Sequence, residues 1–146
     1  GSLDLVLVVD TTQSMENDLP HVQQRLTEIL ADAGERFTTL RVGLVYYRDY
    51  FEEYLNQVHD FQTDLLRVQA SLDRIRVAGG RDLPEAVYEA LYAAIIRPSW
   101  AAEERRIVLI GDAPPHPQPR GAVSAEMVAQ AARERLIRID TIILPP

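Results

Sequence analysis

Runs of consecutive apolar residues alternate along this chain with segments in which apolar residues recur every three or four positions. The first run, residues 5–9, has no polar interruption. Such a run is typical of a strand buried on both faces in the middle of a parallel sheet. Residues 40–47, 107–110 and 137–144 predict three further strands. Residues 50–61 have a mixed pattern that predicts an edge strand, antiparallel to its neighbour.

The segments with helical spacing predict four helices. They cover approximately residues 19–33, 63–76, 82–96 and 124–135. Gly34 is placed to end the first helix, while Thr63 and Ser124 are suitable N-caps for the second and fourth. Strands alternating with helices predict the α/β class: a doubly wound, mainly parallel sheet with helices on both faces and one antiparallel edge strand.

Oxygen-bearing side chains follow or flank these strands in three places. Asp10, Thr12 and Ser14 come directly after the first strand, Asp112 follows the strand at 107–110, and Asp82 and Glu85 open the third helix. Open α/β sheets bind ligands at the carboxyl ends of their strands. Carboxylates and hydroxyls are hard donors that suit Mg²⁺, Mn²⁺ or Ca²⁺ better than zinc. We therefore expect a divalent-cation site.

Helix capping is the simpler interpretation of the same residues. Ser14 or Asp18 could cap the first helix. Asp82 and Glu85 have the spacing of a capping box, with Pro84 in the first turn. Capping and metal binding are compatible, so this reasoning leaves open whether Asp82 or Glu85 is the direct ligand.

Composition narrows the class of protein. The chain has 146 residues, no cysteine and a net charge of −7, and all 15 basic residues are arginine. The negative charge argues against a nucleic-acid partner. No apolar run has the length of a membrane span, so we expect no insertion into a bilayer. Residues 1–2 resemble an expression scar, which leaves one domain at 3–146. The cellular compartment stays undetermined.

The three loops together resemble the metal-ion-dependent adhesion site of von Willebrand factor type A (vWA) domains. In detail, residues 10–19, 81–85 and 112–116 resemble the I-like domain of integrin β chains, and the all-arginine usage suggests a GC-rich, bacterial source. Thr12 stands where the family usually has serine.

The resemblance also implies a role for each candidate ligand. Thr12 and Ser14 would bind the cation directly, together with Asp82 or Glu85. Asp10 and Asp112 would act largely through water. Asn17 and Asp18 match positions that hold an adjacent Ca²⁺ in the integrin β subfamily, which implies a possible second ion.

The function implied is a divalent-cation-dependent protein-binding module. A cation held by few, mostly neutral ligands keeps an exchangeable position that a partner's Asp or Glu can fill. The family sheet normally continues with a helix, a strand and a final helix after the strand at 137–144, and we expect these elements to be missing here, as in an excised domain.

Two alternatives remain at this point. One is a Mg²⁺-dependent phosphatase of the haloacid-dehalogenase type, whose loop has a second aspartate as general acid. Thr12 occupies that position here and cannot transfer a proton near neutral pH. The chain also has no lysine and no phosphate-binding Gly-x-x-x-x-Gly-Lys motif. The other alternative is a purely structural vWA domain with a vacant site.

Overall fold

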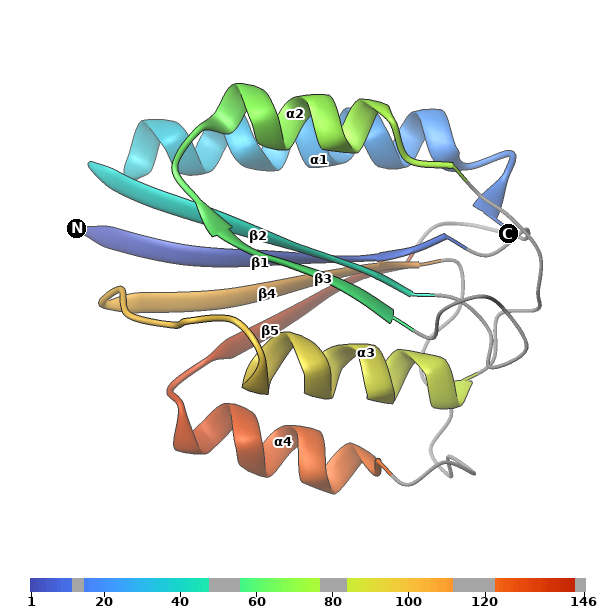
Figure 1. The fold of residues 1–146 in the computed structure, drawn as a ribbon, viewed down its shortest axis with the longest axis vertical. Helices are drawn as coiled ribbons and strands as arrows, with labels where there is room; N and C mark the ends of the chain where they lie inside the picture. Colours follow the sequence, from blue (N-terminus) through green and yellow to red (C-terminus); the bar gives the residue numbers. More distant parts are fainter. Residues whose placement is uncertain (12–14, 48–55, 77–83, 112–122, 144–146) are drawn as a thin grey trace.

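The computed structural model describes residues 1–11, 15–47, 56–76, 84–111 and 123–143 (Figure 1). Strands and helices alternate in the order β1 (Ser2–Asp10), α1 (Leu19–Arg36), β2 (Thr39–Tyr47), β3 (Asn56–Gln62), α2 (Leu65–Asp73), α3 (Pro84–Ile96), β4 (Glu104–Gly111), α4 (Ala125–Glu134) and β5 (Arg138–Ile143). The predicted α/β class is confirmed.

The strands form one sheet in the order β3-β2-β1-β4-β5. β1 is the central strand and runs parallel to both β2 and β4, while β5 is parallel to β4. β3 pairs with β2 in the antiparallel direction and forms one edge, as its mixed pattern predicted. The parallel register places Val9 opposite Ile110. The first and fourth strands therefore end side by side.

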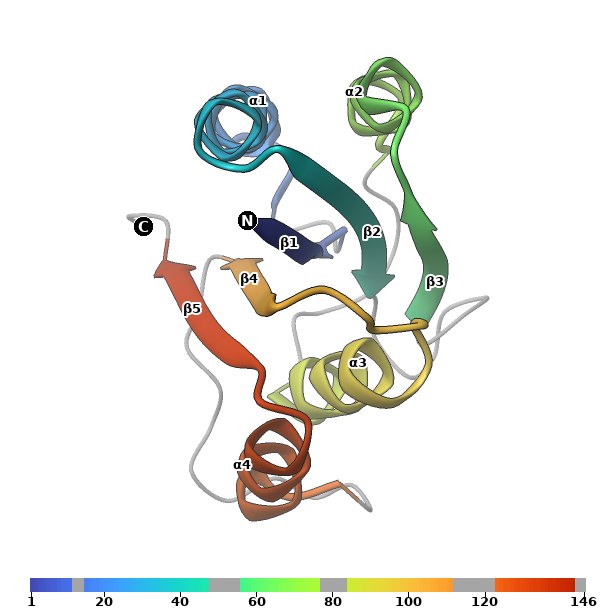
Figure 2. The same ribbon diagram turned by 90° about the vertical axis from the view of Figure 1, so that its left-hand side faces the viewer.

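Helices cover both faces of the sheet. α1 and α2 lie over one face, and α3 and α4 lie over the other (Figure 2). Side chains alternate along β1 between the two cores: Leu5 and Leu7 pack toward α1 and α2, while Val6 and Val8 pack toward α3 and α4. All four are at most 2% exposed, which explains the uninterrupted apolar run.

Three predicted boundaries of the first two helices are wrong. Gly34 does not end the first helix, which continues to Arg36 and stops where Phe37 becomes extended. A glycine inside a helix costs only about 1 kcal/mol relative to alanine. The last turn is closed by a hydrogen bond from the amide of Phe37 to the carbonyl of Ala33 (3.1 Å) and by an ion pair between Arg36 and Asp32 (3.2 Å).

The second helix is capped by Asp64 and not by Thr63. The Asp64 carboxylate accepts hydrogen bonds from the amides of Leu66 (3.1 Å) and Arg67 (3.3 Å). This helix ends at Asp73, earlier than predicted. Ser124, in contrast, caps α4 as predicted, since its hydroxyl accepts a bond from the amide of Met127.

The remaining boundaries differ by a few residues. β3 spans Asn56–Gln62, and residues 50–55 of the predicted edge strand lie outside the described part of the chain. Among the helices that the structure describes, none combines the length and apolar character that a bilayer span requires.

Candidate metal centre

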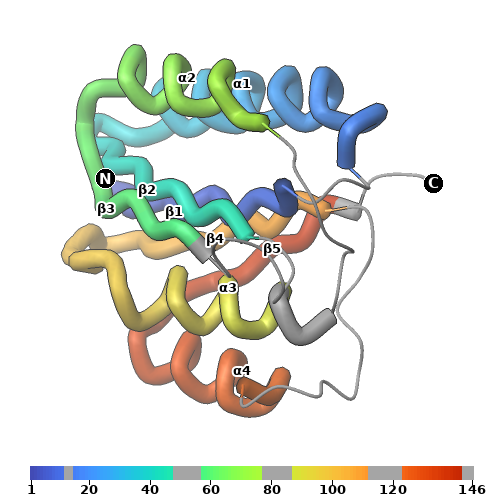
Figure 3. Tube along the Cα trace, turned by 45° about the vertical axis from the view of Figure 1, so that its right-hand side comes forward, coloured from blue at the N-terminus to red at the C-terminus, as the bar shows by residue number. Residues whose placement is uncertain are grey.

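Three neighbouring strands end at one edge of the sheet, which we call the carboxyl edge. Its last residues are Asp10 on β1, Tyr47 on β2 and Gly111 on β4. Figure 3 shows the three strand ends on the same side of the molecule. The chain continues from these residues into segments 12–14, 48–55 and 112–122, so two of the three predicted donor loops begin at this edge.

Asp10 is the predicted ligand whose side chain the structure describes best. It is 0% exposed although it is the last residue of its strand. Burying a carboxylate is costly, and buried charges in proteins are normally paired, hydrogen-bonded or bound to metal ions. The apolar run before Asp10 fixes this position, because the residues of β1 are held in register by strands on both sides.

Gly111 packs closely against Tyr47 and lies beside Asp10. A Cβ atom at Gly111 would lie 3.8 Å from Asp10 Oδ2 and only 3.0 Å from the hydroxyl oxygen of Tyr47. Tyr47 is 1% exposed, so its ring has little freedom to move away. These side chains form a cradle that a larger residue would fill. Asp10 contributes one carboxylate to this cradle, a hard donor of the kind that divalent cations prefer.

Thr11 fixes the direction in which the chain leaves β1. Its amide and its hydroxyl both donate to the backbone carbonyl of Tyr47, each at 3.0 Å. Thr11 is 2% exposed, so this double hydrogen bond is shielded from water. The sequence motif Asp-x-Thr-x-Ser treats Thr11 as a spacer, but the structure shows that it fastens the first loop to β2.

The turn that leads into α1 contains the candidates for a second ion. The amide of Asp18 donates to the carbonyl of Met15, and Met15 is fully buried in the core. Asp18 is the N-cap residue of α1, yet its side chain makes no capping hydrogen bond. The capping interpretation therefore fails for Asp18. Its side chain is partly exposed, and that of Asn17 is exposed.

The other candidate ligands are not placed by the structure. Thr12, Ser14, Asp82 and Asp112 lie outside the described residues, and so does the side chain of Glu85, whose backbone belongs to the first turn of α3. Within the described part of the chain, no three His, Asp or Glu side chains gather to hold a metal ion. These assignments stay predictions.

The strongest charge pairing described lies toward the opposite end of the sheet. Asp4 on β1 is 0% exposed and accepts two hydrogen bonds from Arg41 on β2. The amides of Ala101 and Ala102 also donate to Asp4 Oδ2, at 2.7 and 2.9 Å. Burial alone would raise the pKa of Asp4, but the hydrogen bonds from Arg41 and the two amides hold it below its usual value. The Asp4 carboxylate therefore has a structural role in joining β1, β2 and the segment before β4.

Comparison with solved structures places this fold among known ones. Proximal thread matrix protein 1 from the mussel byssus matches in its crystal form 2, with a TM-score of 0.66 and 16% identity. The same protein with a zinc-occupied MIDAS motif matches with a TM-score of 0.68 and 17% identity. Each alignment covers 97% of this chain and 35% of that one.

A bacterial surface protein is also similar. The open conformation of the pilus adhesin SpaC from Lactobacillus rhamnosus GG matches with a TM-score of 0.59 and 19% identity, over 75% of this chain and 14% of that one. At these identities the likeness concerns the fold alone. This chain thus spans about a third or less of the length of these proteins.

Sequence comparison identifies the family. No curated protein sequence matches significantly. The family model of the von Willebrand factor A domain matches residues 4–144, which is nearly the whole chain. Closeness to integrin β chains and a bacterial origin stay predictions. The match includes residues of all five strands that form the sheet, and the chain therefore belongs to the von Willebrand factor A domain family.

Proposed function

We propose that residues 3–146 form one divalent-cation-dependent protein-binding module, with the cation at the carboxyl edge. Asp10, Thr12 and Ser14 supply the first loop, Asp82 or Glu85 the second and Asp112 the third. The partner is a protein that offers an acidic side chain to the cation. Neither nucleic acid nor a bilayer takes part.

The buried carboxylate of Asp10 carries this proposal. It lies at the carboxyl end of the central strand, where α/β sheets bind ligands, beside the space that Gly111 leaves. If this strand end had only a structural role, a neutral side chain would be less costly to bury than a carboxylate. A cation bound nearby would add to the stabilisation of the charge of Asp10.

The solved structures support the same type of function. One is described as having a zinc-occupied MIDAS motif, and another is a pilus adhesin. We propose Mg²⁺, Mn²⁺ or Ca²⁺ for this chain because the donors are oxygens. Zinc is included among the ions to be tested, because one of the similar structures is described with a zinc-occupied MIDAS motif.

The chemistry of recognition follows from few and mostly neutral ligands. When bound, the cation supplies a positive charge with an exchangeable coordination position. Thr12 and Ser14 would contribute neutral oxygens, and Asp10 would hold the loop through water and hydrogen bonds. Thr11 anchors the loop to β2, so these donors would start from a fixed point.

Thermal unfolding of the chelated protein tests the site. Titration with Mg²⁺, Mn²⁺, Ca²⁺ and Zn²⁺ is compared with the same titration of Thr12→Ala/Ser14→Ala. A control with Thr27→Ala/Thr63→Ala removes two exposed hydroxyls elsewhere. At a hundred times the dissociation constant, the ion adds about 2.7 kcal/mol to the free energy of unfolding. Stabilisation of wild type and control, but not of the loop variant, is expected. Equal responses in all three proteins contradict the proposal.

We infer further that the module does not catalyse a reaction. The position of the general acid in haloacid-dehalogenase phosphatases is occupied by Thr12. Incubation with an aryl phosphate and Mg²⁺ should give no turnover above the buffer rate. Turnover that disappears in Asp10→Asn would establish hydrolase activity instead.

The second ion is a separate part of the proposal. Because the Asp18 side chain is partly exposed and makes no capping bond, it is available to Ca²⁺ together with Asn17. Calorimetric titration with Ca²⁺ should show two sites in the wild type and one in Asp18→Ala. A single site in both proteins removes Asn17 and Asp18 from the list of ligands.

A further inference from the structure

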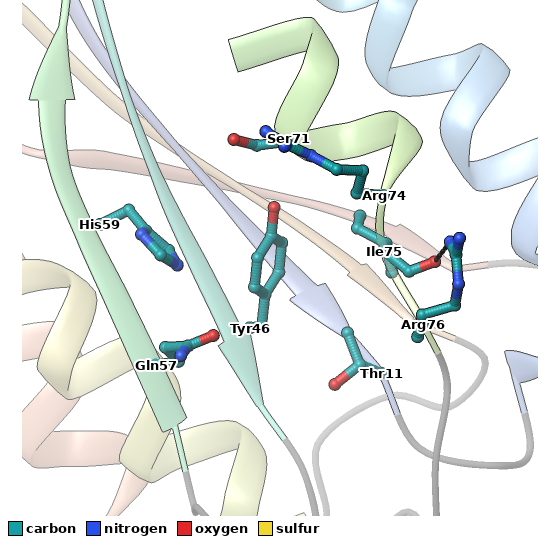
Figure 4. A pocket seen from close by; sticks show the side chains of 8 residues that line it. All are labelled: Thr11, Tyr46, Gln57, His59, Ser71, Arg74, Ile75 and Arg76. Atoms are coloured by element: carbon teal, nitrogen blue, oxygen red, sulfur yellow. Dashed lines mark hydrogen bonds between the residues drawn. The ribbon is translucent and has the colours of Figure 1, made fainter. Parts of the chain in front are cut away.

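A polar pocket opens beside the carboxyl edge, on the side of the sheet covered by α1 and α2. It has a volume of about 290 Å³ and is formed by residues from β1, β2, β3 and the end of α2. The lining residues are Thr11, Tyr46, Gln57, His59, Ser71, Arg74, Ile75 and Arg76. In Figure 4, the ring of Tyr46 lies between His59 and the residues at the end of α2, with Thr11 below them.

The described lining is basic, although the whole chain carries a net charge of −7. Arg74 and Arg76 contribute two guanidinium groups and His59 an imidazole, and the described lining includes no carboxylate. Three acids are next to lining residues in the described sequence. Asp60 accepts hydrogen bonds from Ser99, Asp73 accepts one from Gln69, and Asp10 is buried at the end of β1. A local positive charge within an acidic domain selects an anionic ligand.

Arg74 is the group best placed to bind such a ligand. Its Nε donates to the carbonyl of Ala70 at 3.1 Å, which orients the side chain at the end of α2. Among the described residues, no carboxylate forms an ion pair with it. Its side chain is exposed, and the floor of the pocket consists of the buried residues Tyr46 and Ile75. Because only its Nε takes part in this anchoring bond, the guanidinium can donate hydrogen bonds from its other nitrogens to a carboxylate.

The size of the pocket limits the ligand. Sites for whole small molecules usually have 300–1,000 Å³, and this pocket falls just below that range and is open to solvent. It therefore suits one acidic side chain from a larger partner. Thr11 lines the pocket and directly follows Asp10, so the pocket and the proposed cation site lie on either side of one strand end.

We propose that this pocket binds a second acidic side chain of the protein partner, next to the acidic residue that coordinates the cation. The joint engagement rests on the proposed function, whereas binding of an acidic side chain to the pocket does not require a cation. The partner recognised in this way carries at least two Asp or Glu residues close together, and a single acidic residue is not sufficient for full affinity.

The first test is made in chelator, so that only the pocket contributes. The protein is labelled with ¹⁵N and titrated with acetylated pentapeptides in which two glutamates are separated by one, two or three residues. Matched peptides with glutamine in place of glutamate test whether the negative charge is required. Inorganic phosphate, titrated separately, tests whether another anion binds. The expected result is a set of chemical-shift changes at Ser71, Ile75 and the Arg74 side chain with the glutamate peptides. The shifts should weaken at high salt.

Two variants with the same charge change locate the binding. Arg74→Gln removes the guanidinium in the pocket, and Arg133→Gln removes an exposed one in the last turn of α4. Arg74→Gln should weaken peptide binding about tenfold, as expected for the loss of a charge-assisted hydrogen bond, while Arg133→Gln leaves it unchanged. Circular dichroism and thermal unfolding of both variants check that the fold is intact.

Several outcomes overturn the proposal. Absence of shifts at millimolar peptide, equal shifts with the glutamine peptides, or equal weakening by Arg133→Gln each excludes an acid-binding pocket. Binding of phosphate without binding of the glutamate peptides would show that the pocket recognises a phosphate group and not an acidic side chain.

A repeat of the titration in Mg²⁺ separates this inference from the proposed function. If both are correct, Mg²⁺ strengthens binding of the two-glutamate peptide, and Asp10→Asn abolishes that gain without affecting binding in chelator. If Mg²⁺ has no effect but the chelated protein still binds, the pocket stands and the cation mechanism is wrong. If only the Mg²⁺-dependent binding is seen, the cation mechanism stands and the pocket proposal is wrong.

Discussion

Asp4 and Arg41 are joined by two hydrogen bonds across the central strands, from Nε to Oδ1 at 2.8 Å and from Nη2 to Oδ2 at 2.6 Å. The same guanidinium donates to the carbonyl of Ser99 at 2.9 Å and stacks 4.7 Å above the ring of Phe61. This one pair therefore links β1, β2, β3 and the segment that leads into β4. Its geometry is that of a bidentate ion pair with a fully buried carboxylate.

Removal of the Asp4 carboxylate should strongly destabilise the domain. Asp4→Ala leaves Arg41 and the amides of Ala101 and Ala102 without their acceptor, and breaking a buried pair in this way costs about 3–5 kcal/mol. The free energy of unfolding in urea measures this loss. The control is Glu28→Ala, which breaks an ion pair with Arg25 whose side chains are both 53% exposed. That change should cost no more than about 1 kcal/mol. Equal losses in the two variants would show that the buried pair contributes no more to the free energy of unfolding than the exposed pair does.

The pH dependence of stability should follow from the same carboxylates. Asp4 and Asp60 have lowered pKa values because the hydrogen bonds they accept outweigh the effect of burial, which by itself would raise the pKa. A lowered pKa in the native state stabilises the fold above the pKa of the unfolded chain, about 3.9. This contribution is lost as the pH falls below about 4 and through the native pKa.

Urea unfolding between pH 7 and pH 2.5 measures this effect. The wild type should lose stability steeply at the acidic end. Asp4→Asn should start from lower stability and show a flatter decline, because one of the two groups no longer titrates. Parallel curves for the two proteins would mean that Asp4 does not contribute to the acid sensitivity.

The cradle at the carboxyl edge can be tested with two identical substitutions. Gly111→Ala places a Cβ 3.0 Å from the Tyr47 hydroxyl and should destabilise the domain by about 1–3 kcal/mol. It should also weaken cation binding, because the Tyr47 side chain at the carboxyl edge must shift. Gly34→Ala lies inside α1, where the nearest atom would be 3.9 Å away, and should stabilise the domain by about 0.5–1 kcal/mol. Opposite signs in thermal unfolding are expected, and stabilisation by both substitutions would show that the cradle has room.

The N-cap of α2 can be tested by comparing substitutions of Asp64 and Thr63. Asp64→Ala removes the acceptor of two backbone amides and should cost about 1 kcal/mol. Thr63→Ala changes the adjacent exposed residue and should be nearly neutral. Urea unfolding of the two variants decides between them. A larger loss for Thr63→Ala would restore the boundary that the sequence alone predicts.

The sequence was sufficient for the order of elements but not for the details that depend on tertiary contacts. The apolar run at 5–9 predicted the central strand because burial on both faces leaves no polar alternation. Local propensity favours a stop at Gly34, but the helix continues because the amide of Phe37 bonds to the carbonyl of Ala33 and Arg36 pairs with Asp32. Thr63 and Asp64 are both good N-caps, and only the geometry of the amides decides between them.

The candidate site shows the same division. Asp10 was found because it directly follows a predicted strand. Thr11, Tyr47 and Gly111 were missed, since none of them belongs to the metal motif and their roles appear only when β1, β2 and β4 lie side by side. The same holds for the basic pocket, whose residues come from four elements and carry no motif.

The position of β1 has a consequence for how the domain forms during synthesis. It is the first of the five strands of this sheet to be synthesised, yet its partner β4 lies more than 90 residues later in the sequence, at Glu104–Gly111. Until β4 is made, one edge of this strand, whose residues 5–9 are all apolar, lacks its native neighbour. Such a state favours wrong pairing and aggregation. Asp10 and Gly111 meet only after that step. A nascent or truncated chain without β4 therefore cannot assemble the carboxyl edge, so the proposed cation site would form only after the sheet is complete.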